Sequence, residues 1–366
     1  MKIVHTNYLI VPEFNDPEIW INRLSFYSGV LEELAKEHEV SSVEKINYKG
    51  ELKRKGVTYY FLLFKGRKLY FPFRLHRFIK RLQPDVVFVS GFIFPLQIIQ
   101  LRLKLGKKVK IIVINRSERP FIGFKKYWQR FADRYVNAYL FPSLEFGEQW
   151  VGDGNISSFR KIHEAMHGSS FFVPGNQDVA RSSLSISGSP IFLWVGRLNA
   201  NKDPVTVVKG FIRSLEFQPS AKLYMIYQTE ELLPEIKRLI EENNGACSSI
   251  FLVGKIPHLQ MEEWYRAADF IISGSHYEGG GIAVCEAMSC GCIPVMTNII
   301  SFRKFSGPAK CGLLYEAGNV DALFSVLYKS ISLNINEERK KALLQFREEL
   351  SFEAIGRKIQ DVIASL

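Results

Sequence analysis

Short apolar runs alternate with amphipathic segments along most of the chain. In the first half, the runs IVHTNYLIV, DVVFVS, KIIVIN and NAYLFPS predict buried strands. Between them, apolar residues recur at helical spacing over residues 25–37, 73–82 and 124–135. A series of this kind is typical of a mostly parallel sheet with helices on both faces.

The alternation stops between residues 172 and 190, where the chain is rich in Ser, Gly, Asn and Pro and has no helical period. It then resumes with the strand-like runs IFLWVG, AKLYMIY, SIFLVG, DFIIS and IPVMT. Asp203 followed by Pro204 predicts a helix start, with a capping residue and then a proline at the first helical position. We therefore predict an α/β protein with two doubly wound domains, residues 1–175 and 190–350. Residues 176–189 would link them, and a helix over 351–366 would pack back toward the first domain.

The length of 366 residues suits two domains of ordinary size. No apolar run reaches 18 residues, so we expect no membrane-spanning helix. The N-terminus lacks the pattern of a secretory signal and is expected to form the first buried strand. The chain has five cysteines and no CxxC pair, which favours reduced, buried thiols in a cytoplasmic protein over a metal site; they are Cys247, Cys285, Cys290, Cys292 and Cys311.

Positive charge is concentrated in the first half of the chain. Residues 1–180 hold 28 Lys and Arg against 17 Asp and Glu, whereas residues 181–366 hold 20 of each kind. The excess is densest over 65–81 and 102–134, and residues 74–82 interleave basic and apolar positions as an interfacial helix does. A solvated basic face and an anionic membrane surface both fit this pattern. No nucleic-acid motif accompanies the charge, so we expect no nucleic-acid partner.

The stretch SGSHYEGGGIAVCEAMSCGCIP, residues 273–294, combines two carboxylates with a glycine loop. Glu278 follows a predicted strand, three glycines come next, and Glu286 lies one turn into a predicted helix that Gly291 closes. Free backbone N–H groups and the helix dipole both favour an anion such as phosphate at this place. Arg197 just after one strand and Lys202 just before a helix are two cations suited to a diphosphate.

These motifs carry a family resemblance. VGRLNANKDP, the stretch from GKIPHLQMEEWYRAADF to IPVMT, and CGLLYEAGNVDAL resemble the C-terminal domain of glycosyltransferase family 4, the retaining transferases of GT-B fold. The resemblance covers nearly all of residues 190–360, and its most specific part is the Glu-x7-Glu element from Glu278 to Glu286. It implies a GT-B fold, in which two Rossmann-like domains face each other across a cleft.

The resemblance also implies roles for single residues. Glu278 would contact the donor sugar, Arg197 and Lys202 would neutralise the diphosphate, and Glu286 would bind the ribose hydroxyls. Backbone groups would hold the rest of the nucleotide-sugar, at Gly280, Gly281, Ile282, Gly254 and Ile256. The chain has no DxD carboxylate pair, and we expect neither a metal nor a cofactor, since the nucleotide-sugar is a substrate. Retention would follow from front-face attack, with the leaving phosphate taking the acceptor's proton.

The first domain departs from the family pattern. The segment YLIVPEFNDPEIW has no glycine, and KIIVIN is followed by Arg116, Ser117, Glu118 and Arg119 where many members carry a histidine. Glu118 and Arg119 are candidates for an acceptor or catalytic loop, and a salt-bridged loop pair is the alternative.

One motif indicates a different chemistry. Residues 163–167 spell HEAMH, which on a helix would place His163 and His167 on one face as zinc ligands, with Glu164 as base. Glycines lie on both sides of the motif and no third ligand follows at a suitable spacing, so we interpret the match to HExxH as a coincidence.

The sequence as a whole predicts a retaining, metal-independent hexosyltransferase. It would move a sugar from a UDP- or GDP-sugar to a lipid-linked or saccharide acceptor in the biosynthesis of cell-surface polysaccharide or glycolipid. We expect a cytoplasmic protein, peripheral on the inner face of the cytoplasmic membrane if the basic surface binds lipid. Two alternatives stay open: a GT-B binding subunit that has lost catalysis, and a zinc hydrolase built on HEAMH.

Overall fold

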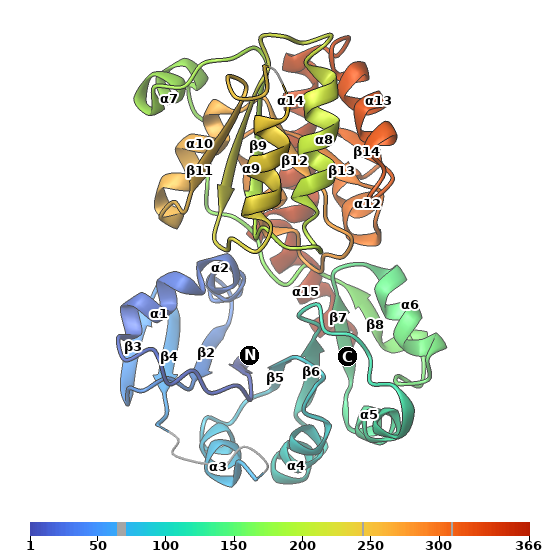
Figure 1. Cartoon of the computed structure of the whole chain (residues 1–366). Helices are drawn as coiled ribbons and strands as arrows, with labels where there is room; N and C mark the ends of the chain where they lie inside the picture. The colour runs from blue at the N-terminus through green and yellow to red at the C-terminus, as the bar shows by residue number, and fades with distance from the viewer. Residues whose placement is uncertain (64–70, 244, 309) are drawn as a thin grey trace. The chain divides into compact units, whose positions relative to one another are not determined.

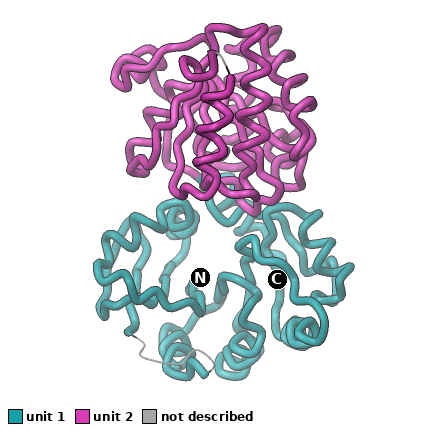
Figure 2. Tube along the Cα trace, viewed as in Figure 1, with its two compact units in different colours: residues 1–169, 352–366 teal, residues 170–351 magenta. Residues whose placement is uncertain are grey.

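The computed structural model describes residues 1–63, 71–243, 245–308 and 310–366 (Figure 1). The chain divides into two compact units (Figure 2). Unit 1 consists of residues 1–169 and 352–366, and unit 2 of residues 170–351. Each unit has its own sheet with helices on both faces. No described helix is long and apolar enough to cross a membrane.

The sheet of unit 1 has eight strands among the described residues, in the order β3-β4-β2-β1-β5-β6-β7-β8. All neighbours are parallel except β3 and β4. The four strands predicted for this half are confirmed, although the first is shorter than expected. The strands are β1 Lys2–Thr6, β2 Glu39–Glu44, β3 Gly50–Arg54, β4 Val57–Phe61, β5 Val86–Ser90, β6 Lys110–Ile114, β7 Ala138–Phe141 and β8 Ile162–Glu164.

Helices α3, α4 and α5 lie along one face of this sheet, and α2 and α15 lie along the other (Figure 1). α15 packs on α2 so closely that a side chain on Gly29 would come within 2.5 Å of the Phe352 ring. The helices are α1 Pro17–Arg23, α2 Ser25–Leu34, α3 Phe73–Arg81, α4 Pro95–Leu105, α5 Lys126–Ala132, α6 Leu144–Gly152 and α15 Phe352–Ser365. Short 3₁₀ turns cover Gly123–Lys125, Asp133–Tyr135 and Phe159–Lys161.

Two predictions for unit 1 need correction. The helix expected over residues 124–135 is divided into a 3₁₀ turn, α5 and a second 3₁₀ turn. The hairpin of β3 and β4 was also not predicted from the sequence; its tight turn places Lys55 and Gly56 at positive φ. β3 has the sequence GELKR, which contains too few apolar residues to predict a strand. The first part of the expected basic stretch, residues 65–70, lies outside the described residues.

The sheet of unit 2 is parallel throughout, with the order β11-β10-β9-β12-β13-β14. Its core includes the stacked rings of Phe192 and Phe270, 5.0 Å apart, with Phe211 of α8 packed edge-on against Phe192. The five predicted strands are confirmed. The strands are β9 Ile191–Gly196, β10 Lys222–Tyr227, β11 Ile250–Gly254, β12 Phe270–Ser273, β13 Ile293–Thr297 and β14 Leu313–Tyr315.

The predicted start of α8 is confirmed. The Asp203 carboxylate accepts a hydrogen bond from the Thr206 N–H at 3.1 Å, and Pro204 is the first helical residue. The helices of unit 2 are α7 Gln177–Leu184, α8 Pro204–Ser214, α9 Leu233–Glu241, α10 Met261–Ala267, α11 Ile282–Ser289, α12 Ile300–Ser306, α13 Val320–Ser330 and α14 Ile335–Gln345. A 3₁₀ turn covers His258–Gln260, and a π turn at Phe346–Leu350 follows α14.

The stretch expected to have no helix, residues 172–190, contains α7. Asn176 caps this helix by accepting from the Val179 N–H at 3.0 Å, and Ala180 is its buried residue. A helix that buries so little apolar surface leaves no periodic pattern in the sequence. It is held instead by polar contacts, because Arg181 Nη2 donates to the Asp269 carboxylate at 2.7 Å.

Asp269 joins three elements of unit 2. One carboxylate oxygen accepts from Arg181 and from the Ile191 N–H at 2.8 Å, and the other accepts from Arg339 Nη2 at 2.9 Å. The side chain is nearly buried, so these donors replace the water that it would bind in the unfolded chain. The carboxylate thereby fixes α7 and α14 to the start of β9.

We predict that Asp269→Asn lowers the free energy of unfolding of unit 2 by about 3 kcal/mol, because two partly buried guanidinium groups lose the buried carboxylate that pairs with both. Urea unfolding followed by circular dichroism measures the change. The control is Asp178→Asn on the exposed side of α7, which should change stability by less than about 0.5 kcal/mol. Equal effects of the two substitutions would contradict this role for Asp269.

Candidate functional site

The loops after β9 and β12 meet at the carboxyl edge of the unit 2 sheet. They pass so closely that a side chain on Gly274 would lie 2.7 Å from the Asp203 carbonyl oxygen. α8 and α11 begin from these same loops, and Gly281, at φ 47°, immediately precedes α11. Ligands of parallel sheets bind beyond this edge, where backbone N–H groups at helix starts are free.

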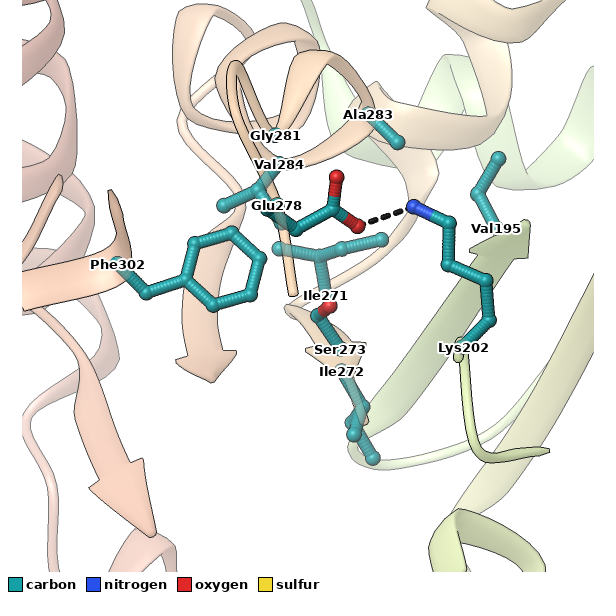
Figure 3. Close-up of a pocket in the computed structure, with 10 residues that line it drawn as sticks. All are labelled: Val195, Lys202, Ile271, Ile272, Ser273, Glu278, Gly281, Ala283, Val284 and Phe302. Atoms are coloured by element: carbon teal, nitrogen blue, oxygen red, sulfur yellow. Dashed lines mark hydrogen bonds and ion pairs between the residues drawn. The ribbon is translucent and has the colours of Figure 1, made fainter. Parts of the chain in front are cut away.

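Lys202 and Glu278 come together at this edge. The Lys202 ammonium donates to Glu278 Oε1, and the Ser275 hydroxyl donates to the same oxygen at 2.7 Å. Figure 3 shows the lysine extended toward the carboxylate across a small pocket with apolar walls. The lining residues are Val195, Lys202, Ile271, Ile272, Ser273, Glu278, Gly281, Ala283, Val284 and Phe302. Both charged side chains are only partly exposed, so the pair is screened less than a surface ion pair.

Glu286 lies on α11 with its carboxylate buried. Oε2 accepts from the Tyr265 hydroxyl at 3.0 Å, and Oε1 accepts from His258 Nε2 at 2.6 Å. The Phe172 ring packs against the rings of His258 and Tyr265, with its centroid 5.1 Å and 6.0 Å from theirs. These contacts keep the carboxylate in one orientation. Each oxygen retains a lone pair that a ligand hydroxyl can use.

His258, Tyr265 and Phe172 were not found by sequence reasoning. His258 lies in a 3₁₀ turn and Phe172 in an irregular segment, so neither belongs to a periodic pattern. The hydrogen bond to Glu286 raises the pKa of His258 and outweighs the opposing effect of burial. Burial, and then the charge of Glu286, raises the pKa of Tyr265 far above its usual value, so Tyr265 remains a donor.

The other expected residues of unit 2 lie around this edge with different exposure. Arg197 is exposed, and no described residue forms an ion pair with its guanidinium. Gly280 is buried, and Ile282 is the first residue of α11. Gly254, at φ 85°, ends β11, and Ile256 follows in the loop that leads to His258. The structure therefore brings Lys202 into contact with Glu278 and leaves Arg197 extended into solvent.

In unit 1, Glu118 has a structural role. Its carboxylate accepts from the backbone N–H groups of Phe92 and Arg116, both at 2.6 Å, and so ties the loop after β6 to the segment after β5. Burial raises the pKa of Glu118 and outweighs these bonds. Arg119 is exposed.

Arg116 has an unusual environment for a guanidinium. It lies over two rings, 4.6 Å from the centroid of Tyr27 and 5.5 Å from that of Phe26. None of the described residues accepts a hydrogen bond from its side chain. The stacking fixes the plane of the group, and its N–H donors stay available to solvent or to an anion. The sequence pattern alone indicated no role for Arg116.

The HEAMH motif is not helical. His163 and Glu164 belong to β8, and residues 165–167 follow in an irregular segment. Alternation along a strand points neighbouring side chains to opposite faces, so the i and i+4 geometry of a zinc helix does not arise. The described residues contain no group of three His, Cys, Asp or Glu side chains placed to hold a metal. Of the five cysteines, Cys247 is exposed, contrary to the expectation that all are buried.

We predict that the stability lost in His258→Gln depends on pH. The pKa of His258 is raised by folding, so the stability that its charge contributes is fully present below the unfolded value of about 6.5. It is lost as the pH rises through the higher folded value. Urea unfolding of both proteins across this range measures the difference. Tyr265→Phe removes the other donor to Glu286 and is the control, because it should lower stability by the same amount at every pH in this range. An effect of His258→Gln that does not change with pH would contradict the ion pair.

Known proteins resemble this chain in sequence and in fold. Residues 176–343 match the model of the family described as "Glycosyl transferases group 1". A lipopolysaccharide core biosynthesis mannosyltransferase from Rhizobium meliloti is 24% identical over 62% of this chain and 63% of its own length. A D-inositol 3-phosphate glycosyltransferase from Segniliparus rotundus is 28% identical over 33% of this chain and 27% of its own. The chain thus spans about a quarter to two thirds of these relatives.

Solved structures share the fold over the whole chain. The Anabaena protein Alr3699/HepE, solved with UDP and glucose, matches 100% of both chains with a TM-score of 0.73 and 11% identity. Sucrose-phosphate synthase from Thermosynechococcus elongatus covers 100% of this chain and 99% of its own with a TM-score of 0.71 and 14% identity. At such identities the likeness concerns the GT-B fold alone. Over residues 176–343 the chain is thus similar to the glycosyl transferases group 1, and its fold has the GT-B architecture.

Proposed function

We propose that this protein is a retaining, metal-independent hexosyltransferase of family 4 that uses a UDP- or GDP-sugar. The observation that carries the proposal is the contact of Lys202 with Glu278 beside the start of α11, close in sequence to the buried Glu286. A nucleoside diphosphate needs cations at its phosphates and a hydroxyl acceptor at its ribose. This edge of unit 2 offers both.

In this proposal the charged residues act on the leaving diphosphate. Its negative charge increases as the glycosidic bond breaks, and Lys202, Arg197 and the N–H groups at the start of α11 stabilise that charge. Glu278 orients Lys202 before the donor arrives and then contacts the sugar. Glu286, held by His258 and Tyr265, accepts hydrogen bonds from the ribose hydroxyls. The acceptor attacks from the leaving-group side and gives its proton to the departing phosphate.

The relatives support the substrate classes. The Rhizobium relative is named for lipopolysaccharide core biosynthesis, and another, from Xanthomonas oryzae, is named a GDP-mannose:cellobiosyl-diphosphopolyprenol alpha-mannosyltransferase. We propose a lipid-linked or saccharide acceptor in cell-surface polysaccharide or glycolipid biosynthesis. The acceptor-side loop would be the one that contains Arg116, Glu118 and Arg119. We also propose that the protein works in the cytoplasm at an anionic membrane surface, which its basic unit 1 would contact.

A second candidate is a GT-B subunit that binds nucleotide without turnover. It is motivated by the loop after β6, which has Arg116 where many family members carry histidine. The two candidates differ in turnover and not in binding. The zinc hydrolase is not proposed further, because the HEAMH residues lie on a strand and an irregular segment.

We predict that UDP or GDP raises the thermal unfolding temperature, and that the rise persists in EDTA. It should disappear in Glu286→Ala, because the ribose loses its acceptor. Glu241→Ala, on the exposed end of α9, is the matched control and should keep the full shift. If no nucleotide shifts the wild type, or if Glu286→Ala responds as the control does, the donor site is wrongly placed.

We predict that Lys202→Met lowers kcat by about 100-fold or more, because one fixed positive charge at the leaving group is lost. Release of nucleoside diphosphate from the donor sugar that gives the largest thermal shift measures the rate. Lys209→Met, an exposed lysine of α8, should leave kcat unchanged. Undiminished turnover in Lys202→Met would remove Lys202 from the mechanism. Binding without turnover in the wild type would favour the second candidate.

A further inference from the structure

A short segment of unit 1 exposes an unusual number of large apolar side chains. The segment is residues 122–131, called here the aromatic segment, and it covers a 3₁₀ turn and most of α5. Its exposed residues are Ile122 (86% exposed), Phe124 (79%), Tyr127 (63%), Trp128 (49%) and Phe131 (42%). Exposed apolar residues scattered singly are common, but five within ten residues mark an interaction site.

The same segment is cationic. Lys125, Lys126 and Arg130 lie within it and Arg134 just beyond, whereas residues 119–132 contain no Asp or Glu. The basic groups lie close to the rings, with Lys126 Nζ 5.7 Å from the Tyr127 centroid and Arg134 5.5 Å from that of Phe131. Lysine and arginine stems that accompany aromatic rings in this way are typical of a surface at a lipid interface.

The neighbouring helices extend this surface. α4 contacts both α3 and α5, and the three lie side by side on one face of the unit 1 sheet (Figure 1). At the end of α4, Leu103 is exposed and is followed by exposed Lys104, Lys107 and Lys108. At the start of α3, the exposed rings of Phe71 and Phe73 stack at 5.9 Å. Exposed basic residues follow on α3 at Arg74, Arg77, Lys80 and Arg81.

The chemistry of the segment favours a lipid surface over a protein partner. Tyr127 and Trp128 each have an apolar body and one polar group, the combination that is enriched where a bilayer meets water. The many cations match the negative potential of an anionic leaflet, to which each basic residue near the surface adds attraction. Protein interfaces, in contrast, are depleted in lysine at their centres.

We propose that the aromatic segment inserts into the head-group region of an anionic membrane, while the basic residues of α3 and α4 contact the lipid phosphates beside it. The inference deepens the proposed function by naming the surface through which unit 1 would meet the membrane. Vesicle binding needs neither a donor nor turnover. It can therefore fail while nucleotide binding succeeds, and nucleotide binding can fail while vesicle binding succeeds.

Trp128 provides an internal probe of insertion. It is the exposed one of the five tryptophans, since the other four are 1–8% exposed: Trp20, Trp150, Trp194 and Trp264. We predict that the fluorescence of the full chain shifts to the blue on addition of phosphatidylcholine vesicles containing about a third phosphatidylglycerol, an anionic lipid. Pure phosphatidylcholine should give little shift, and Trp128→Phe should abolish the response.

Co-sedimentation with the same vesicles distinguishes the contribution of apolar insertion to binding from the contribution of positive charge. Phe124→Ser with Ile122→Ser should weaken binding at least tenfold, and Lys125→Gln with Lys126→Gln should weaken it by about fivefold per charge removed. Leu259→Ser is the matched control, because Leu259 is as exposed as Ile122 but lies in unit 2, and it should bind as the wild type does. All variants should keep the thermal shift with nucleotide.

Three results would overturn the inference. The first is that the wild type does not bind anionic vesicles. The second is that Leu259→Ser loses as much binding as the variant of the aromatic segment. The third is concentration-dependent self-association in analytical ultracentrifugation that Phe124→Ser with Ile122→Ser abolishes, since the segment would then be an interface between two copies of the chain.

Discussion

The candidate site depends on the close approach of two loops at one edge of a parallel sheet. Parallel pairing of β9 with β12 brings the ends of both strands to the same edge, and Gly274 lets the second loop pass the carbonyl of Asp203 without a side chain between them. Lys202 and Glu278, 76 positions apart in sequence, reach each other because of this approach. A side chain at residue 274 would separate the loops, and with them the cation from the carboxylate.

The two carboxylates of the site are held by different kinds of partner. Glu278 precedes the three-glycine loop and is held by a lysine and a serine, partners that a phosphate would replace in the proposed function. Glu286 is buried on α11 between Tyr265 and His258, partners that fix it from the protein side. In the proposed function, this difference would let the contacts at the phosphate end change during reaction while the ribose end is held in place. His258 is half exposed, so its proton, and with it the charge beside Glu286, responds to solvent pH.

Much of the fold could be predicted from the sequence, because the buried strands of a parallel sheet are apolar throughout and their helices are amphipathic. KIIVIN and IFLWVG are examples. The N-terminal cap of α8 could also be predicted, because its signal consists of two adjacent residues, Asp203 and Pro204. Strand β3 and helix α7 could not be predicted, because β3 has no buried residue and α7 buries only Ala180. The pairing of Arg181 and Arg339 with Asp269 joins residues far apart in sequence, which no local pattern reveals.

The residues of the candidate site also fall into those that the sequence could predict and those that it could not. Lys202, Glu278 and Glu286 belong to motifs with a recognisable spacing, whereas His258, Tyr265 and Phe172 become neighbours of Glu286 only in the folded unit. Arg116 was visible as a departure from the family pattern, but its position over Tyr27 and Phe26 depends on the packing of α2 beside the loop after β6. The exposed aromatic rings of α5 were concealed in the sequence, because the same residues at helical spacing predict a buried face.

The proposed function requires that the carboxyl edge of unit 2 bind a nucleoside diphosphate. A crystal structure of the protein with UDP or GDP, whichever binds more tightly, tests it most directly. In that structure we expect diphosphate oxygens at Lys202 and at the start of α11, ribose hydroxyls at Glu286, and a Lys202–Glu278 contact that has opened to admit the phosphate. A nucleotide bound elsewhere, with Lys202 still on Glu278 and Glu286 still enclosed by His258 and Tyr265, would contradict it.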